Sequence, residues 1–191
     1  SPFLPSESPY GYTKQACEKL IVNHAEENGE FSSALLRYFN PIGAHPSAVI
    51  GESPRGIPNN LIPFLCQAVA KLRGPLTVFG TDYPTKDGSC IRDYLHVMDL
   101  AEAHVKAICY LFETGKGKGC RAYNLGTGTG VSVLEVIEAF EKVTGEKVPY
   151  TLGDRREGDV VAIWANAKRA KEELKWETKR SLEQGLNDSW N

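Results

Sequence analysis

Tyr10 and Lys14, in the stretch SPYGYTK near the start of the chain, have residue types and a spacing suited to acid–base chemistry. An α-helix turns about 100° per residue, so residues four apart project from one face. A phenol is a poor base at neutral pH, and a neighbouring ammonium group lowers its pKa by favouring the ionised form. Tyr12 points to roughly the opposite side of such a helix. Spacing alone also fits a plainer alternative, a solvated lysine beside a half-buried tyrosine.

Two arginines, Arg92 and Arg156, are the best candidates for holding an anion. A guanidinium group is a planar fork that contacts a phosphate group through two hydrogen bonds. The chain as a whole is not basic, with 22 Lys and Arg, 24 Asp and Glu, and a formal net charge of -2. This balance argues against a nucleic-acid partner and for a few local arginines. The structural alternative is that Arg92 forms a surface salt bridge with Asp93 or Asp99.

The elements that must position these residues alternate between helices and strands. Ser8 is suited to cap a helix that begins at Pro9. The spacing of its apolar residues predicts a buried face made of Cys17, Leu20, Ile21 and His24. Loop 41–58 is rich in glycine and proline and long enough to be functional. Further strands are predicted at 32–40, 76–80, 91–97, 121–126 and 148–153, and further helices at 59–74, 98–115, 132–145, 166–175 and 181–190. This alternation predicts an α/β fold with a largely parallel sheet.

Length and composition narrow the class of protein. With 191 residues, 41% of them hydrophobic, the chain can bury one core, or one core and a smaller lobe. Its five cysteines are scattered, which predicts reduced thiols of a cytosolic protein rather than disulfides or a zinc site. No apolar run approaches the length of a membrane span, so we expect no membrane partner and a cytoplasmic location. His45, His96 and His104 are expected to be structural, with no metal site.

Longer strings carry a resemblance to a known family. Tyr-x-x-x-Lys followed by LRYFNPIGAH resembles the extended short-chain dehydrogenase/reductases. GIPNNLIPF, LTVFGTDYPTKDGSCIRDYLHVMDLAEAH, YNLGTGTGVSVLEV and RREGDV are similar, in that order, to strings of the UDP-glucose 4-epimerases within that family. The resemblance implies a Rossmann-like dinucleotide-binding sheet that holds NAD and a smaller lobe that binds a UDP-sugar. The implied reaction interconverts UDP-glucose and UDP-galactose by NAD-mediated oxidation and re-reduction at sugar C4.

The resemblance also implies a role for each candidate residue. Tyr10 would take the proton from the sugar 4-hydroxyl, and Lys14 would bind the nicotinamide ribose and lower the pKa of Tyr10. Tyr38 would contact the cofactor, and Asn40 the diphosphate or the sugar. The other implied substrate contacts are Asn59, Asn60 and Leu61, then Thr77, Val78 and Phe79 against the uridine, Arg92 and Arg156 on the diphosphate, and Asp159 on a ribose hydroxyl.

Some of these residues have plainer alternatives. Asn59 or Asn60 would ordinarily cap the helix that follows, and Phe79 read alone fits a core position. Arg155 receives no clear role and is expected to shape its loop. Ile163 matches the position whose bulk admits or excludes an N-acetyl group in the family. Because isoleucine is intermediate in size, acceptance of N-acetylated sugars stays open.

The glycine-rich string NLGTGTGVSVLEV does not fit the dinucleotide fingerprint, because the sixth position from Gly126 is Val131 rather than glycine. The resemblance places that fingerprint, and the Ser/Thr partner of the tyrosine, before residue 1. We therefore expect the C-terminal half or more of an epimerase, with no turnover on its own. Residues 1–40 would end the dinucleotide-binding domain, and 41–191 would mainly form the UDP-sugar lobe, with 91–126 returning to the dinucleotide-binding sheet.

Three functional hypotheses follow from the sequence. The first is a UDP-glucose 4-epimerase, which the resemblance implies to be a homodimer that uses the tyrosine-bearing helix as part of its interface. The second is a related enzyme, a UDP-N-acetylhexosamine 4-epimerase or a nucleotide-sugar dehydratase. The third is a UDP-binding piece without catalytic activity.

Overall fold

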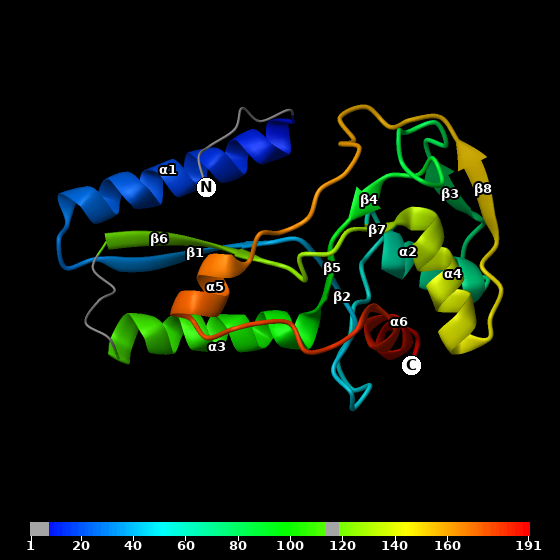
Figure 1. Cartoon of the computed structure of the whole chain (residues 1–191). Coiled ribbons are helices and arrows are strands. Elements are labelled where there is room, and N and C mark those ends of the chain that lie inside the picture. The colour runs from blue at the N-terminus through cyan, green and yellow to red at the C-terminus, as the bar shows by residue number, and fades with distance from the viewer. Residues whose placement is uncertain (1–7, 114–118) are drawn as a thin grey trace.

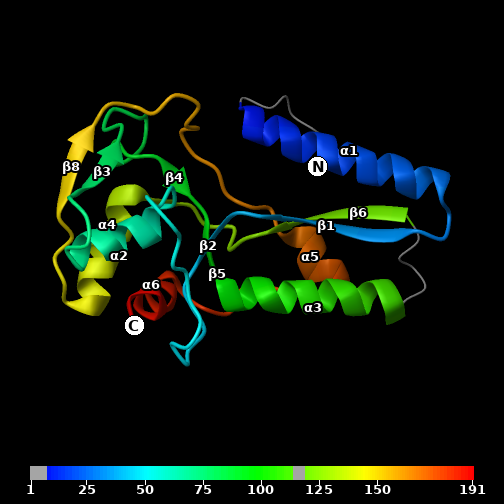
Figure 2. The ribbon, with the colours of Figure 1, turned by 180° about the vertical axis from the view of Figure 1, so that it is seen from behind.

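The first part of the fold is a two-stranded layer covered by helices on both faces. The computed structural model describes residues 8–113 and 119–191. Strand β1 (Ser32–Tyr38) pairs in parallel with β6 (Gly119–Leu125). Helix α1 (Pro9–Glu27) covers one face of the pair, and α3 (Val97–Glu113) and α5 (Lys168–Glu173) cover the other, as Figure 1 and the reverse view in Figure 2 show.

The chain then crosses into short connecting strands. Strand β2 (Asn40–Ile42) pairs in parallel with β5 (Tyr94–His96), and β4 (Ile91–Arg92) pairs antiparallel with β7 (Val131–Ser132). The crossing lies at Phe39, whose amide still donates to a carbonyl of β6, whereas the next amide donates to the carbonyl of Asp93, just before β5. One continuous segment therefore joins the two parts of the fold.

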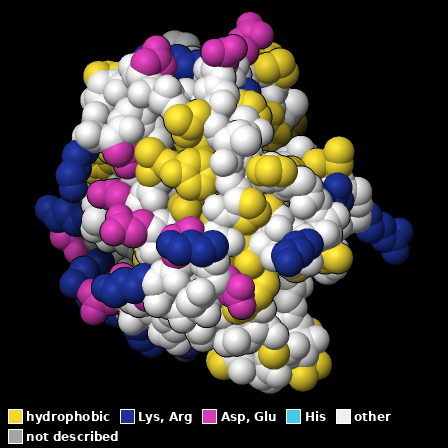
Figure 3. All heavy atoms as spheres, turned by 90° about the vertical axis from the view of Figure 1, so that its right-hand side faces the viewer, with side chains coloured by type: hydrophobic (Ala, Val, Ile, Leu, Met, Phe, Trp, Pro, Cys, Tyr) yellow, Lys and Arg dark blue, Asp and Glu magenta, His cyan; other side chains and the backbone are white. Residues whose placement is uncertain are grey.

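The second part contains β3 (Leu76–Phe79), paired in parallel with β8 (Tyr150–Gly153). Its helices are α2 (Leu61–Val69), α4 (Val133–Thr144) and α6 (Leu182–Trp190). Their apolar faces share one core, whose buried members include Leu65, Val78, Val136, Phe140 and Leu186. Figure 3 views this side of the molecule, where hydrophobic side chains emerge in the middle of the face. The predicted α/β class with parallel pairing is confirmed.

Helix α1 begins where the sequence predicts, because the Ser8 hydroxyl accepts from the Gly11 amide at 3.1 Å and Pro9 opens the first turn. Its predicted buried face is wrong. Leu20 is 70% exposed, and Cys17 and His24 are also exposed. Within α1, all of which the structure describes, Ala25 alone is buried. A layer two strands wide covers only part of a helix of 19 residues, which leaves the other side uncovered.

None of the helices in the described part of the chain is long and apolar enough to cross a membrane.

The packing of α2 against α6 can be tested through Cys66, whose thiol donates to the Ser189 carbonyl. Burial raises the pKa of the Cys66 thiol to about 11. Because the thiolate is the nucleophile, we expect iodoacetamide at pH 8 to modify Cys66 roughly a hundredfold more slowly than the exposed Cys17. Time-resolved peptide mass spectrometry would measure both rates. Equal rates would contradict the packing of α2 on α6.

Candidate functional site

A cavity of about 400 Å³ lies between the connecting strands and the second part of the fold. Its walls contain every residue that the sequence predicts as a substrate contact except Val78. Strand β3 explains that exception, since alternate side chains of a strand face opposite sides and Val78 is in the core. The lining residues are Asn40, Ile57, Pro58, Asn59, Asn60, Leu61, Phe64, Leu76, Thr77, Phe79, Cys90, Arg92, Tyr94, Val133, Arg156 and Asp159.

A second cavity, of about 670 Å³, adjoins the first. The two share the wall formed by Asn40, Asn60, Leu61, Arg92 and Tyr94. The second cavity extends to the first part of the fold, where its lining includes Tyr10, Tyr38 and Ile163. The predicted acid–base tyrosine and the predicted anion-binding arginines therefore border two adjoining cavities, and Arg92 lines both.

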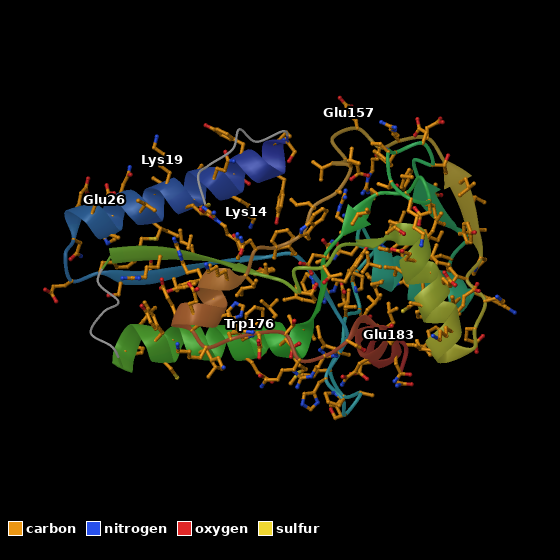
Figure 4. The ribbon with its side chains drawn as sticks, in the orientation of Figure 1. Lys14, Lys19, Glu26, Glu157, Trp176 and Glu183 are labelled. Carbon is orange, nitrogen blue, oxygen red and sulfur yellow. The ribbon has the colours of Figure 1, made fainter. Side chains whose placement is uncertain are left out.

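Tyr10 and Lys14 share one face of α1, as their spacing predicts. The Lys14 Nζ atom lies 5.2 Å from the centroid of the Tyr10 ring. Figure 4 shows Lys14 on the side of α1 that faces the β1–β6 pair, opposite Lys19 and Glu26. The Tyr10 side chain is 70% exposed and lines the second cavity. The phenol is thus open to a ligand, with a lysine ammonium beside its ring.

Arg92 is fixed by three groups at the edge of the cavity. Its Nη1 atom donates to the carbonyls of Ile91 and Val160, both at 2.8 Å, and its Nη2 atom donates to Asp159 Oδ1 at 3.3 Å. The alternative of a salt bridge to Asp93 or Asp99 is wrong. The Arg92 side chain is only 15% exposed, so its guanidinium group is held in one place at the cavity wall.

Arg156 also lines the cavity and contacts the same carboxylate as Arg92. Its Nε atom lies 3.4 Å from Asp159 Oδ2, and its Cζ atom lies 5.3 Å from the centroid of the Phe79 ring. The Phe79 ring is 41% exposed and faces the cavity, so the core alternative is wrong for this residue. Two guanidinium groups here meet one carboxylate, which leaves positive charge in excess beside an aromatic face.

Two further ionisable groups of the cavity wall, the Cys90 thiol and the Tyr94 phenol, are uncharged at neutral pH. Burial raises the pKa of the Cys90 thiol, and burial also raises the pKa of the Tyr94 phenol. Both groups line the first cavity and stay protonated near neutral pH. Neither therefore adds negative charge that would oppose an anion beside Arg92 and Arg156.

Asn60 is the residue that precedes α2, yet among the described residues its side chain makes no capping hydrogen bond. Its Nδ2 atom instead donates to Glu52 Oε1 in the long loop, at 3.3 Å. The capping alternative is therefore wrong for this side chain. The loop holds the Asn60 amide at the border of both cavities.

Asp93 stands between the cavity residues Arg92 and Tyr94 and has a structural role that the sequence does not predict. It is fully buried, and Oδ1 accepts from the amide and the hydroxyl of Thr127 at 2.9 and 2.7 Å. Oδ2 accepts from the amides of Gly128 and Ala165, both at 3.0 Å. The glycine-rich turn thus binds a carboxylate of its own chain. Its partners lie far from Asp93 in sequence, so no local pattern signals this role.

The three predicted structural histidines have protein partners. His96 is buried, its Nδ1 atom accepts from the Met98 amide at 3.0 Å, and its Nε2 atom lies 3.1 Å from Asp188. His104 contacts the carbonyl of Leu100, and His45 contacts Ser47. Residues 8–113 and 119–191 contain no group of three or more His, Cys, Asp or Glu arranged to hold a metal ion.

Known proteins resemble this chain over nearly all of its length. A family model described as GDP-mannose 4,6 dehydratase matches residues 1–189. The UDP-glucose 4-epimerase of Bacillus subtilis (strain 168) is 55% identical over 188 residues, which are 98% of this chain and 54% of that protein. The UDP-glucose 4-epimerase of Erwinia amylovora is 47% identical over 191 residues, which are 100% of this chain and 56% of that protein.

A solved structure gives the same result in three dimensions. The UDP-glucose-4-epimerase (galE) from Stenotrophomonas maltophila, with bound NAD and formylated UDP-arabinopyranose, matches with a TM-score of 0.94 and 44% identity. That match covers 100% of this chain and 56% of that one. The chain spans about half the length of the relatives it matches.

Proposed function

Because this chain belongs to the family described as GDP-mannose 4,6 dehydratase, within the extended short-chain dehydrogenase/reductases, we propose that the whole protein is a UDP-glucose 4-epimerase. It would interconvert UDP-glucose and UDP-galactose with NAD as its cofactor. The observation that carries the proposal is a pair of adjoining cavities, one lined by Arg92, Arg156 and Phe79 and the other by Tyr10. The UDP-glucose 4-epimerases named above add support through their identity to nearly the whole chain.

The residues around Tyr10 fit a nicotinamide ribose. Tyr38 ends β1, and the carboxyl ends of parallel strands are where α/β sheets bind ligands. The rings of Tyr10 and Tyr38 are exposed and would contact the cofactor, and Lys14, beside the Tyr10 ring, would donate to a ribose hydroxyl. NAD, when bound, would accept the hydride from sugar C4 and return it.

Each side chain then has a definite task. Tyr10 would take the proton from the sugar 4-hydroxyl and give it back, with the Lys14 ammonium beside its ring. Arg92, already fixed by two carbonyls, would bind the diphosphate, and Arg156 would close on it from the other side. Asn40, at the border of both cavities, would hold the diphosphate or the sugar between them.

The remaining predicted residues would contact other parts of the substrate, with Thr77, Val78 and Phe79 against the uridine. Phe79 would stack on the base, and Asp159 would accept a hydrogen bond from a ribose hydroxyl. The other residues proposed here are Asn59, Asn60, Leu61, Thr77 and Val78, the last through its backbone because its side chain is in the core.

We propose a cytoplasmic homodimer for the whole protein. The exposed Tyr12 and Leu20 on α1 support a helical interface on that side. We also propose that residues 1–40, with 91–126, belong to the dinucleotide-binding domain, since β1 and β6 pair and α3 covers them. Residues 41–191 would otherwise form the UDP-sugar lobe, apart from α5, which packs under β6. Sedimentation equilibrium of the whole protein would test the dimer.

The direct test is turnover. The whole protein supplied with NAD should convert UDP-galactose to UDP-glucose, measured by coupling the product to UDP-glucose dehydrogenase. Binding of UDP without any conversion would favour the non-catalytic hypothesis. A 4-keto-6-deoxy sugar nucleotide as the product would favour the dehydratase hypothesis, which the description of the family model keeps open.

Ile163 is expected to set the upper size of the sugar, because it lines the second cavity beside Tyr10. In Ile163→Tyr we expect kcat/KM for UDP-N-acetylglucosamine to fall at least about tenfold, since a larger side chain would fill the space of the acetamido group. Activity on UDP-galactose should stay within about threefold. Val161→Tyr introduces the same side chain two residues away, outside the lining of both cavities, and is the control. Unchanged activity of Ile163→Tyr on the acetylated sugar would show that Ile163 is not the gate.

A further inference from the structure

Arg155 lies next to the cavity arginine Arg156, but its side chain is held on the neighbouring loop 80–90. Its Nε atom donates to Asp82 Oδ1 at 2.7 Å, and its Nη2 atom donates to the Asp82 carbonyl at 2.6 Å. Its Cζ atom lies 4.3 Å from the centroid of the Tyr83 ring, and Tyr83 is buried. One guanidinium group therefore holds a side chain, a backbone carbonyl and an aromatic face of the same loop.

Both loops that this contact joins reach the cavity, loop 80–90 at Cys90 and loop 154–159 at Arg156 and Asp159. Loop 80–90 follows Phe79 at the end of β3, and loop 154–159 follows β8 and carries Arg156 and Asp159. The loops leave β3 and β8 side by side, since the Gly80 amide donates to the Gly153 carbonyl at 2.9 Å.

Gly80 lies where the two loops pack closest to Tyr83 and Arg155. Its φ is +76°, and a side chain there would collide with the Tyr83 ring and touch Arg155. A residue other than glycine would strain the backbone and displace the surface on which Arg155 rests. The two loops can therefore approach this closely only because residue 80 is a glycine.

Arg156 depends on its loop for its position. Its side chain is 57% exposed, and its contacts to Asp159 are long, at 3.4 and 3.5 Å. Asp159 belongs to the same loop, so this pair cannot anchor the loop to anything else. Gly158, with φ +79°, adds a residue of high backbone freedom between them. Asp159 also accepts from Arg92, and Arg156 lies over the Phe79 ring, whereas the contact of Arg155 with Asp82 and Tyr83 joins this loop to loop 80–90.

We infer that Arg155 is a positioning residue that clamps loop 154–159 to loop 80–90 and thereby directs Arg156 and Asp159 at the diphosphate and ribose of a bound UDP-sugar. The inference rests on the proposed function, because it takes the cavity as a nucleotide-diphosphate site. An exposed ion pair contributes little to folding stability, so removing the clamp should change ligand binding rather than the melting temperature.

The test is a double-mutant cycle with UDP titrated calorimetrically into the whole protein. Arg155→Gln should weaken UDP binding roughly five- to tenfold and raise KM for UDP-galactose by a similar factor, with kcat within about twofold. In an Arg156→Gln background, Arg155→Gln should weaken UDP binding clearly less than it does in the wild type, because the part of its effect that acts through Arg156 is already lost. Arg155→Lys, which keeps the charge but not the planar fork, should fall between wild type and Arg155→Gln.

Arg169→Gln is the matched control, because Arg169 is an exposed arginine on α5, remote from the lining of both cavities. It should bind UDP like the wild type. Unaltered UDP binding by Arg155→Gln, or an effect that adds fully to that of Arg156→Gln, would overturn the clamp alone. A wild-type protein that binds no UDP would overturn the proposed function together with the clamp.

Discussion

Tyr10→Phe is expected to lower kcat of the whole protein roughly a thousandfold while leaving its affinity for UDP unchanged. Phenylalanine keeps the ring beside Lys14 but lacks the oxygen that would take the proton of the sugar 4-hydroxyl. UDP binding should survive because the cavity that holds Arg92, Arg156 and Phe79 does not include Tyr10 in its lining. The measurements are steady-state conversion of UDP-galactose and calorimetric titration with UDP.

The chain offers a close control for this experiment. Tyr12 lies on the same helix, is 69% exposed and would undergo the same loss of one hydroxyl in Tyr12→Phe. Turnover by Tyr12→Phe should match the wild type. If Tyr10→Phe kept more than about a tenth of wild-type kcat, Tyr10 would not be the general base, and another group would have to hold the proton.

Asp93→Asn is expected to lower the free energy of unfolding by about 3 kcal/mol. The Asp93 carboxylate is fully buried and accepts four hydrogen bonds, from two donors of Thr127 and from the amides of Gly128 and Ala165. An asparagine has the same shape but turns an NH₂ group toward N–H donors. The donors that faced the replaced oxygen would then lose their acceptor, and the new NH₂ group would face them without an acceptor of its own.

Urea unfolding of the whole protein, followed by circular dichroism, would measure the loss caused by Asp93→Asn. Asp154→Asn makes the same chemical change at an exposed carboxylate and should alter the free energy of unfolding by less than about 0.5 kcal/mol. Equal stability of the two variants would mean that the glycine-rich turn does not depend on Asp93.

Local features of this fold could be predicted because their causes are local. Ser8 and Pro9 mark the start of α1, and helix geometry alone brings Lys14 to Tyr10. The buried face of α1 could not be predicted from spacing, since burial of Leu20 depends on how wide a layer lies beneath the helix.

The sequence predicted most of the residues that line the site, but not the hydrogen bonds and ion pairs between them. The resemblance implies roles for both Arg92 and Asp159, but the sequence offers only the nearer acids Asp93 and Asp99 as alternative partners of Arg92. In the fold, Arg92 reaches Asp159 across 67 residues. The clamp by Arg155 also joins residues 73 apart, which no local pattern encodes.

The parallel pairs of the described chain also carry a kinetic consequence. Strand β1 must find β6 across 87 residues, and even Asn40 and Tyr94, which join β2 to β5, are 54 residues apart. Loop closure over such spans costs entropy before any pairing compensates for it, so assembly should be slow for a chain of this size. During that delay the edge of β1 would stay unpaired. Low temperature and dilution during refolding should therefore raise the yield of native protein.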